Sequence, residues 1–417
     1  MGAPGFVCQL CGSKDTPFVV LDLGLQPICN AFLTAKELSQ AEEKYPLKMV
    51  LCNRCRLAQL ADRIPEQAVF GPNFNYLSGS SKALLRYFRN FSETEVRRFD
   101  LGGRSVCDVG SNDGSLLSYF KRAGCTVVGV EPTPLPAKQA YAIGVTTIQA
   151  YFTESVATTI VRKFGTMKLV TAMNVVAHAS EIESFLNGVR RLMGRDGTFA
   201  SQSHYLPFLI ERLEYDTIYH EHLRYYTLAT LRNLFGRFGL TVFDAETNEI
   251  YGGSILVHAS TRTRPPSEGM IRLLKKESRF LELPVYKAFR KEVEGNSRRL
   301  RALLVGLRRK GKTIVGIGAP MKSSTLLNYC HLGPDLIAYL TEVNPLKIGT
   351  FSPGVHIPVV PDERILEDSP DYAVLLSWNM AEDIIQKFRD KGYGGKFIIP
   401  VPRPRVARSQ GLARTPK

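Results

Sequence analysis

The 417-residue sequence lacks the features of a secreted or membrane-spanning protein. Residues 1–6 contain no basic segment followed by an apolar run, and no later stretch is long and apolar enough to cross a bilayer. The eight cysteines do not form a disulfide framework, because four of them make two Cys-x-x-Cys pairs and the other four are scattered. We therefore expect a soluble, cytoplasmic protein with no membrane partner.

Acidic residues are scarce: 39 against 54 lysines and arginines, a formal net charge of +15. The excess of basic residues is greatest over residues 272–312 and over residues 403–417. The second of these stretches contains no acid. Such charge attracts the phosphates of nucleic acid, membrane or a nucleotide, but it is more often the solvated face of a helix. Charge alone does not identify a partner. We expect the basic tail to be disordered.

Two short cysteine loops predict a metal site near the amino terminus. Cys8 and Cys11 form one Cys-x-x-Cys pair, and Cys52 and Cys55 form the other. This spacing lets both thiolates of each loop face one ion, and four thiolates are typical of a closed, structural zinc site. We predict a zinc ribbon whose Zn²⁺ takes no part in catalysis. Cys29 has no partner at this spacing and is interpreted as a buried apolar residue.

The middle of the chain lacks a complete Gly-x-Gly-x-x-Gly fingerprint, so no pyrophosphate cradle is evident. A helix over 82–99 precedes a buried strand over 105–109, a turn over 110–114 and a second strand over 127–130. Glycines after the first strand let the backbone approach a nucleoside, and an acid after the second strand suits ribose hydroxyls. A carboxylate at the end of the first strand also suits a cationic ligand. The residues predicted to bind S-adenosylmethionine are Asp108, Gly110, Asn112, Gly114, Glu131, Phe152 and Asn174.

The order of predicted elements indicates an α/β protein with two Rossmann-like units. The first unit continues through strands over 169–172 and from residue 198. The second has a strand and glycine-rich loop over 312–320, a helix over 322–329, and strands over 337–340 and 372–376. Charged helices over 270–309, interrupted near Pro284, separate the two units. We predict a zinc-binding domain over 1–72, an S-adenosylmethionine-dependent methyltransferase domain over 73–265, and a helical linker with a Rossmann-like domain over 266–417.

The segment Tyr219-His220-Glu221-His222 offers a base without the geometry of a metal site. A zinc pair on a helix needs histidines four residues apart, whereas His220 and His222 are two apart. One imidazole can then turn into a pocket while the other turns away, which favours carbon methylation over metal-dependent hydrolysis. His178 follows the strand over 169–172, at an edge where open sheets bind ligands; the alternative is a core histidine.

These motifs together resemble one family: the three-domain sugar C-methyltransferases that modify nucleotide-linked deoxysugars in antibiotic and surface-polysaccharide pathways. Nearly the whole chain takes part. Besides the cysteine pairs, the resemblance rests on Gln26 to Phe32, Asp108 to Gly114, Asn174 to His178, Asp216 to His222, Tyr251 to Ser254, Gly316 to Ala319, Asn344-Pro345, Pro353 to Pro358 and Ser377 to Asn379.

The resemblance implies a reaction at a carbon beside a 4-keto group of a nucleotide sugar, which we expect to be dTDP-linked. A base removes the acidified proton, and the enolate carbon takes the methyl group. By resemblance, His222 is the base, His178 stabilises the enolate oxygen, and Glu221 and Tyr219 order the site or contact the sugar, with Tyr76 a further candidate. The alternatives are a salt bridge or a helix-start carboxylate for Glu221, and a packing aromatic for Tyr219.

Four positions depart from the family pattern. Phe74 and Ile317 stand where tyrosines are usual, Tyr251 replaces a histidine, and Leu256 replaces an arginine. These changes suggest a different sugar, or different contacts to it.

Two other functions are compatible with parts of the sequence. The zinc ribbon and positive charge favour a nucleic-acid methyltransferase, but aromatic and basic residues are not interleaved as stacking platforms, and no Asn-Pro-Pro-Tyr motif occurs. We therefore expect no nucleic-acid partner. The remaining alternative is an inactive zinc scaffold, against which His222, Glu131 and Gly110 argue.

Overall fold

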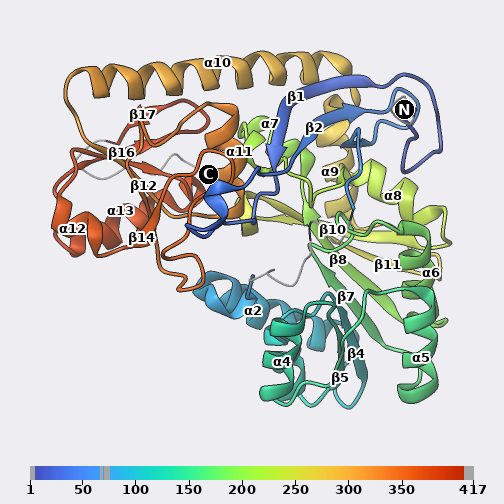
Figure 1. Cartoon of the computed structure of the whole chain (residues 1–417). Helices are drawn as coiled ribbons and strands as arrows, with labels where there is room; N and C mark the ends of the chain where they lie inside the picture. Colours follow the sequence, from blue (N-terminus) through green and yellow to red (C-terminus); the bar gives the residue numbers. More distant parts are fainter. Residues whose placement is uncertain (1–4, 66–68, 70–75, 408–417) are drawn as a thin grey trace.

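The computed structural model describes residues 5–65, 69 and 76–407 (Figure 1). The predicted domain boundary at 72–73, the family departure at Phe74 and the tail beyond residue 407 lie outside these residues. The described residues form three β-sheets with helices around two of them. No helix within the described part of the chain is both long and apolar enough to cross a bilayer.

The smallest sheet carries the two cysteine loops. It is antiparallel in the order β1-β2-β3-β9, with strands β1 (Phe18–Pro27), β2 (Lys44–Leu51), β3 (Ala58–Leu60) and β9 (Arg224–Tyr225). Its edge strand β9 comes from far along the chain, and Ala58 pairs with Tyr225. The segment that follows His222 is therefore part of the sheet of the zinc-binding region.

The central sheet has the order β10-β11-β8-β7-β4-β5-β6, and the five strands from β8 to β6 are parallel. Strands β10 and β11 are antiparallel to each other, and β11 is antiparallel to β8. The strands are β4 (Ser105–Val109), β5 (Thr126–Val130), β6 (Thr147–Ile148), β7 (Leu169–Met173), β8 (Thr198–His204), β10 (Thr241–Asn248) and β11 (Ser254–Ser260). The helices that accompany it are α2 (Lys82–Phe99), α3 (Ser115–Arg122), α4 (Pro134–Ala142), α5 (Glu154–Phe164), α6 (Ile182–Met193), α7 (Leu206–Glu211) and α8 (Leu228–Gly236).

The Rossmann-like interpretation of this region is confirmed, and the predicted helix over 82–99 is α2. Ser81 ends the preceding extended segment and caps α2, because its side chain accepts a hydrogen bond from the Leu84 amide. Apolar side chains on β4 and β7 are buried from both sides, as in other parallel sheets. The parallel strands all end at one edge, and that edge carries the candidate site.

The third sheet has the order β14-β13-β12-β15-β16-β17, parallel except for β17. Its strands are β12 (Ile314–Ile317), β13 (Leu340–Glu342), β14 (Val359–Pro361), β15 (Tyr372–Leu375), β16 (Lys396–Ile399) and β17 (Arg405–Val406), with helices α11 (Met321–Tyr329), α12 (Arg364–Asp368) and α13 (Ala381–Asp390). The predicted strand over 337–340 is wrong in position. Ile337 is a buried core residue in the preceding turn, and the strand continues instead to Glu342.

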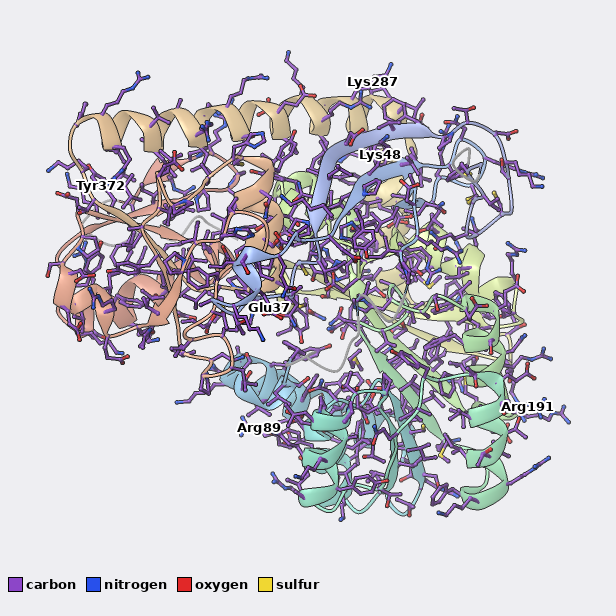
Figure 2. All side chains as sticks on the ribbon, in the orientation of Figure 1. Glu37, Lys48, Arg89, Arg191, Lys287 and Tyr372 are labelled. Carbon is purple, nitrogen blue, oxygen red and sulfur yellow. The ribbon has the colours of Figure 1, made fainter. Side chains whose placement is uncertain are left out.

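A long helix connects these units. After α9 (Glu268–Glu277) and the short helix η5 (Ser278–Leu281), α10 (Leu283–Arg309) runs for 27 residues and lies along β1 and the third sheet (Figure 1). The predicted interruption is confirmed, and Pro284 lies in the first turn of α10. Figure 2 shows Lys287 on its outer face, pointing away from the protein. Much of the positive charge here belongs to a solvated helix face.

Candidate active site and metal centre

The glycine turn after β4 is held by the acid after β5. The Glu131 carboxylate accepts hydrogen bonds from the backbone N–H of Asn112 at 2.9 Å and of Thr133 at 2.8 Å. Gly110 has φ 70°, and a Cβ there would lie 2.5 Å from Val175 Cγ2, so the turn requires glycine. Burial raises the pKa of Glu131. The predicted turn and the predicted acid therefore lie together.

The remaining residues predicted to bind S-adenosylmethionine lie around this turn with different partners. The Asn112 side chain accepts from the Ser78 N–H and donates to the Tyr76 carbonyl, so it fixes the segment before α2. Gly114 has φ 74° and closely approaches Ala140 of α4. The backbone N–H of Asn174 donates to the Gln202 carbonyl of β8.

Asp108 and Phe152 have partners within the protein. Asp108 is buried in β4 and accepts a hydrogen bond of 2.6 Å from the Thr171 hydroxyl of β7, and burial raises its pKa to about 7. Phe152 packs edge-to-face on Phe185 of α6, with ring centroids 5.3 Å apart. Both side chains thus contribute to packing within the sheet and its helices.

His222 lies in a half-buried cluster of rings. Its centroid is 4.1 Å from that of Tyr219, 5.0 Å from His178 and 6.3 Å from His204. Burial, and then the neighbouring histidines, hold the pKa of His222 well below its usual range. His222 Nδ1 lies 2.8 Å from the Thr217 carbonyl, which can only accept, so Nδ1 carries the proton and Nε2 carries the lone pair.

His178 has the same arrangement. Its Nδ1 lies 2.6 Å from the Glu221 carbonyl oxygen, and burial lowers its pKa to about 4. Two neutral imidazoles, each fixed through Nδ1, therefore face each other across the candidate site. Of the two imidazoles that the sequence predicts to point differently, His220 is the one that turns away: its Nε2 lies 3.3 Å from the Pro46 carbonyl, in the zinc-binding region.

The carboxyl group of Glu221 contacts a thiol. Cys29 Sγ lies 3.1 and 3.2 Å from the two Glu221 oxygens, and both side chains are buried. The interpretation of Cys29 as merely apolar is therefore incomplete. Burial raises the pKa of Glu221 to about 7 and raises that of Cys29 well above its usual value. The salt-bridge alternative for Glu221 is not what the structure shows, since its partner is a thiol.

Tyr76 lies at the rim of this region. Its hydroxyl is 2.7 Å from that of Tyr251, one of the departures from the family pattern. Tyr251 itself has φ 57°, in the left-handed region that few residues of its size adopt. The pair links the segment before α2 to the loop between β10 and β11.

Two sets of contacts near the Tyr219 to His222 segment were not predicted from the sequence. His204 Nε2 lies 2.8 Å from Glu214 Oε2, and Asp216 accepts a hydrogen bond of 2.6 Å from Trp378 Nε1. Lys322 Nζ of α11 lies 3.8 Å from Asp216. His204 ends β8, so the strand-edge argument applied to His178 would have found it. The contacts of Asp216 join distant segments and leave no pattern in the sequence.

The four cysteines of the two loops form one cluster, as predicted. Cys8 Sγ lies 3.5 Å from Cys55 Sγ, Cys11 Sγ lies 3.6 Å from Cys52 Sγ, and all four sulfurs lie within 4.8 Å of one another. A tetrahedron with metal–sulfur bonds of about 2.3 Å has edges of about 3.8 Å, so the cluster fits one ion. Hydrogen bonding from Cys55 lowers the pKa of Cys8 to about 5, in keeping with a thiolate there.

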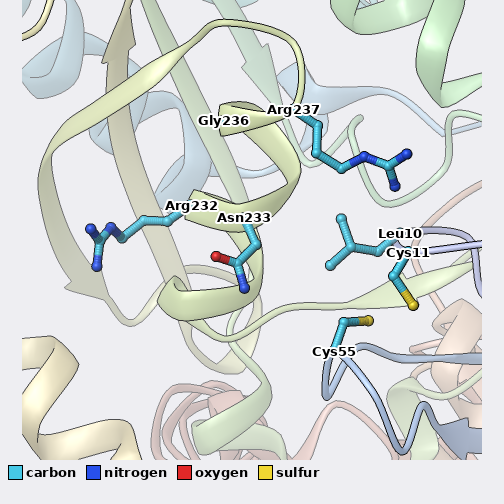
Figure 3. Close-up of a pocket in the computed structure, with 7 residues that line it drawn as sticks. All are labelled: Leu10, Cys11, Cys55, Arg232, Asn233, Gly236 and Arg237. Carbon is cyan, nitrogen blue, oxygen red and sulfur yellow. The ribbon is translucent and has the colours of Figure 1, made fainter.

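A surface pocket lies beside this cluster. Figure 3 shows Cys11 and Cys55 facing Asn233 and Arg237 of the α8 region across it. None of the predicted catalytic residues lines this pocket. It marks the junction of the cysteine loops with the central unit.

Comparison with known proteins agrees with this architecture over nearly the whole chain. Three family models match: a zinc binding domain over residues 8–70, a methyltransferase domain over 73–245 and a C-methyltransferase C-terminal domain over 249–402. The C-methyltransferase NovU of Streptomyces niveus is 35% identical over 410 residues, which are 97% of this chain and 97% of NovU. The chain belongs to this C-methyltransferase family. It is an S-adenosylmethionine-dependent C-methyltransferase, and the predicted family is confirmed.

Solved structures match less than half of the chain, and only weakly. Magnesium protoporphyrin IX methyltransferase from Synechocystis PCC 6803 with bound SAM is 16% identical, with a TM-score of 0.32, over 43% of this chain and 79% of that one. The YcgJ protein from Bacillus subtilis is 14% identical, with a TM-score of 0.34, over 42% of this chain and all of that one. Likenesses this low carry no argument about substrate.

Proposed function

We propose that this C-methyltransferase acts on a nucleotide-linked 4-keto-deoxysugar, and that His222 is the base that removes the proton beside the ketone. The observation that carries the proposal is the state of His222. Its Nδ1 is committed to the Thr217 carbonyl and its pKa is held low, so a neutral ring presents the Nε2 lone pair within the half-buried cluster. A neutral imidazole is suited to accept a proton near neutral pH.

The reaction balances without a further reagent. The C–H bond beside the ketone breaks, its proton passes to His222 Nε2, and the electron pair becomes that of an enolate. Bound S-adenosylmethionine supplies an electrophilic methyl group. The enolate carbon forms the new C–C bond as the sulfur–methyl bond breaks, and S-adenosylhomocysteine is the leaving group. The ketone is restored, and His222 returns its proton to solvent.

The other residues of the cluster have supporting roles in this proposal. His178, 5.0 Å from His222 between ring centroids, is the proposed stabiliser of the enolate oxygen. It can donate to that oxygen only in its protonated form, because the single N–H of the neutral ring is held by the Glu221 carbonyl. Tyr219 stacks beside the base, Glu221 orders the segment through Cys29, and Tyr76 contacts the sugar from the rim. Asp108, Gly110, Asn112, Gly114, Glu131, Phe152 and Asn174 form the donor site.

The remaining parts of the proposal concern metal and domains. Cys8, Cys11, Cys52 and Cys55 hold one Zn²⁺, which stabilises the amino-terminal fold and takes no part in the chemistry. The domains are residues 1–72, 73–265 and 266–417, and the last contributes to holding the nucleotide of the substrate.

The test is methyl transfer from labelled S-adenosylmethionine to a panel of nucleotide 4-keto-deoxysugars, with RNA and DNA in parallel. We expect label at a sugar carbon, with solvent deuterium entering the same position. The variant His222→Asn should lose turnover and deuterium exchange while its donor affinity stays near wild type. His356→Gln, which removes an imidazole paired with Glu42 away from the cluster, is the control. Label in nucleic acid alone, or normal turnover by His222→Asn, contradicts the proposal; absence of donor binding would favour a scaffold.

A further inference from the structure

A third histidine lies beside the proposed base, and none of the roles above uses it. His204 is the last residue of β8, at the sheet edge that also presents His178. Its Nε2 lies 2.8 Å from Glu214 Oε2, and the side chains are 10% and 1% exposed. A carboxylate this deeply buried requires a partner of opposite charge.

The hydrogen bonds around His204 indicate its protonation. The Thr217 hydroxyl has one proton and donates it to the Glu214 carbonyl at 2.7 Å. Toward His204 Nδ1, 3.5 Å away, this hydroxyl can therefore only accept. Glu214 likewise accepts from Nε2. Both ring nitrogens then carry protons, which describes an imidazolium.

The charges nearby lead to the same conclusion. Asp216 lies 3.8 Å from the Lys322 ammonium, so that cation is engaged by a second buried carboxylate. Lys322 and Arg212 also lie within electrostatic range of Glu214, but Lys322 is shared with Asp216 and Arg212 is paired with Glu249. Among the described residues, His204 is the one that hydrogen-bonds to the Glu214 carboxylate. The Glu214 carboxylate packs closely against the backbone at Gly252, where an added Cβ would lie only 3.0 Å from Glu214 Oε1.

The group that the His204–Glu214 pair affects is His222. The ring centroids of His204 and His222 are 6.3 Å apart, and the other groups that face His222 are His178, Tyr219 and Tyr225. None of these three carries a negative charge at neutral pH, since burial lowers the pKa of His178 and raises those of both tyrosines. None of these three groups offsets a positive charge on His204, whose counter-charge is the Glu214 carboxylate.

We infer that His204 and Glu214 form an ion pair whose imidazolium keeps His222 in its neutral, proton-accepting form. His204 is thus a positioning residue of the reaction, acting through the base, and this role rests on the proposed function of His222. Its positive charge disfavours a second proton nearby until the substrate gives one up, when the new negative charge of the enolate offsets the repulsion.

The test reads protonation directly and needs no substrate. In protein labelled with ¹⁵N-histidine, the seven rings are assigned from single His→Gln variants and followed by NMR from pH 5 to 9. We expect both His204 nitrogens to be protonated at pH 7.5 and His222 to be neutral. In Glu214→Gln the His204 ring should become neutral at that pH. In His204→Gln the titration midpoint of His222 should rise by about one to two pH units, as expected for a unit charge about 6 Å away.

The matched control removes the same chemical pair elsewhere. His356 Nε2 lies 3.0 Å from Glu42 Oε2, and His356→Gln should leave the titration of His222 unchanged. A neutral His204 in the wild type, or an unchanged His222 midpoint in His204→Gln, overturns the inference. These outcomes do not depend on turnover, so they are distinguishable from a failure of the proposed substrate or base. If Glu214→Gln does not fold, His204→Gln alone decides.

Discussion

The two Rossmann-like units of this C-methyltransferase share one structural feature, a carboxylate that accepts a hydrogen bond from the glycine turn, but the surroundings of the two turns differ. In the central unit Glu131, after the second strand, accepts from the Asn112 amide of the glycine turn at 2.9 Å. In the carboxyl-terminal unit Glu342, the last residue of the second strand β13, accepts from the Ala319 amide of its own turn at 3.0 Å. The same strand–turn–acid geometry has therefore formed twice in one chain.

The two units differ in the contacts made by the second turn and by the helix that follows it. Lys347 Nζ of the carboxyl-terminal unit donates to the Ala319 carbonyl at 2.8 Å, and the following helix α11 packs against the segment that precedes His222. There Thr325 Oγ1 donates to the Ile218 carbonyl at 2.9 Å. The second unit therefore differs from the first in that the helix after its glycine turn supports the segment that precedes His222.

The largest expected effect is a loss of stability on disruption of the cysteine cluster, which packs beside the central unit. Cys8→Ser and Cys55→Ser should each lose the bound metal and destabilise the amino-terminal region by several kcal/mol, because structural zinc supplies folding free energy. Metal content by mass spectrometry and urea unfolding measure this. Cys125→Ser is the control, since that buried thiol donates to the Leu101 carbonyl outside the cluster. Full metal content in both cluster variants would remove the zinc assignment.

The comparison of the two acids is tested most directly by matched substitutions. Glu131→Gln should weaken S-adenosylmethionine binding by about 10- to 100-fold, the usual contribution of a hydrogen bond to a charged group. Glu342→Gln should leave donor affinity unchanged, because that carboxylate holds the second turn. Isothermal titration calorimetry measures both. Equal losses would mean that the second turn also contributes to the donor site.

The bracing role of the carboxyl-terminal unit predicts a smaller effect on turnover. Trp378→Phe removes the hydrogen bond from Nε1 to Asp216 and should lower kcat by about 5- to 10-fold, the effect of one buried hydrogen bond on the geometry of the catalytic segment. Donor affinity should not change. Steady-state kinetics with single-turnover controls measure the loss, and Trp378→Phe with wild-type kcat would show that the contact is only structural.

A final expected effect is a pH dependence of stability to which His178 of the central unit contributes. Burial lowers the pKa of His178 to about 4, below its unfolded value of about 6.5, so the unfolded state binds the proton first. Stability contributed by neutral His178 is therefore present above about pH 6.5 and is lost as the pH falls toward about 4. Urea midpoints at pH 7 and pH 5 should differ less in His178→Gln than in the wild type; an equal difference would place the titrating group elsewhere.

Local patterns in the sequence predicted the framework well. Buried apolar runs ending in glycine turns located β4, β5 and β7, and helical periodicity located α2 to its terminal residues. The cysteine spacing located the metal cluster for the same reason, since each pair is a local structure. The strand β13 was misplaced because Ile337, which is apolar, is buried in a turn, whereas the strand ends on the polar residue Glu342.

The contacts that build the site were less predictable, because they join distant segments. Cys29 meets Glu221 across 192 residues, and Asp216 meets Trp378 across 162. No periodicity encodes such pairs. The family resemblance supplied His222 and its neighbours, but only the three-dimensional arrangement placed His204 and Glu214 beside them.

The short strand β9 bears on how chimaeras of this family should be cut. It follows His222 by two residues, yet it belongs to the sheet of the cysteine loops, where the Leu60 amide donates to the Leu223 carbonyl and Arg224 donates to the Gln9 side chain at 2.9 Å. If residues 1–72 were exchanged between relatives, the segment around His222 would pack on a sheet from a different protein, and these contacts would no longer be matched. Chimaeras should therefore take residues 218–226 from the same parent as the amino-terminal region, although the two segments are far apart in the sequence.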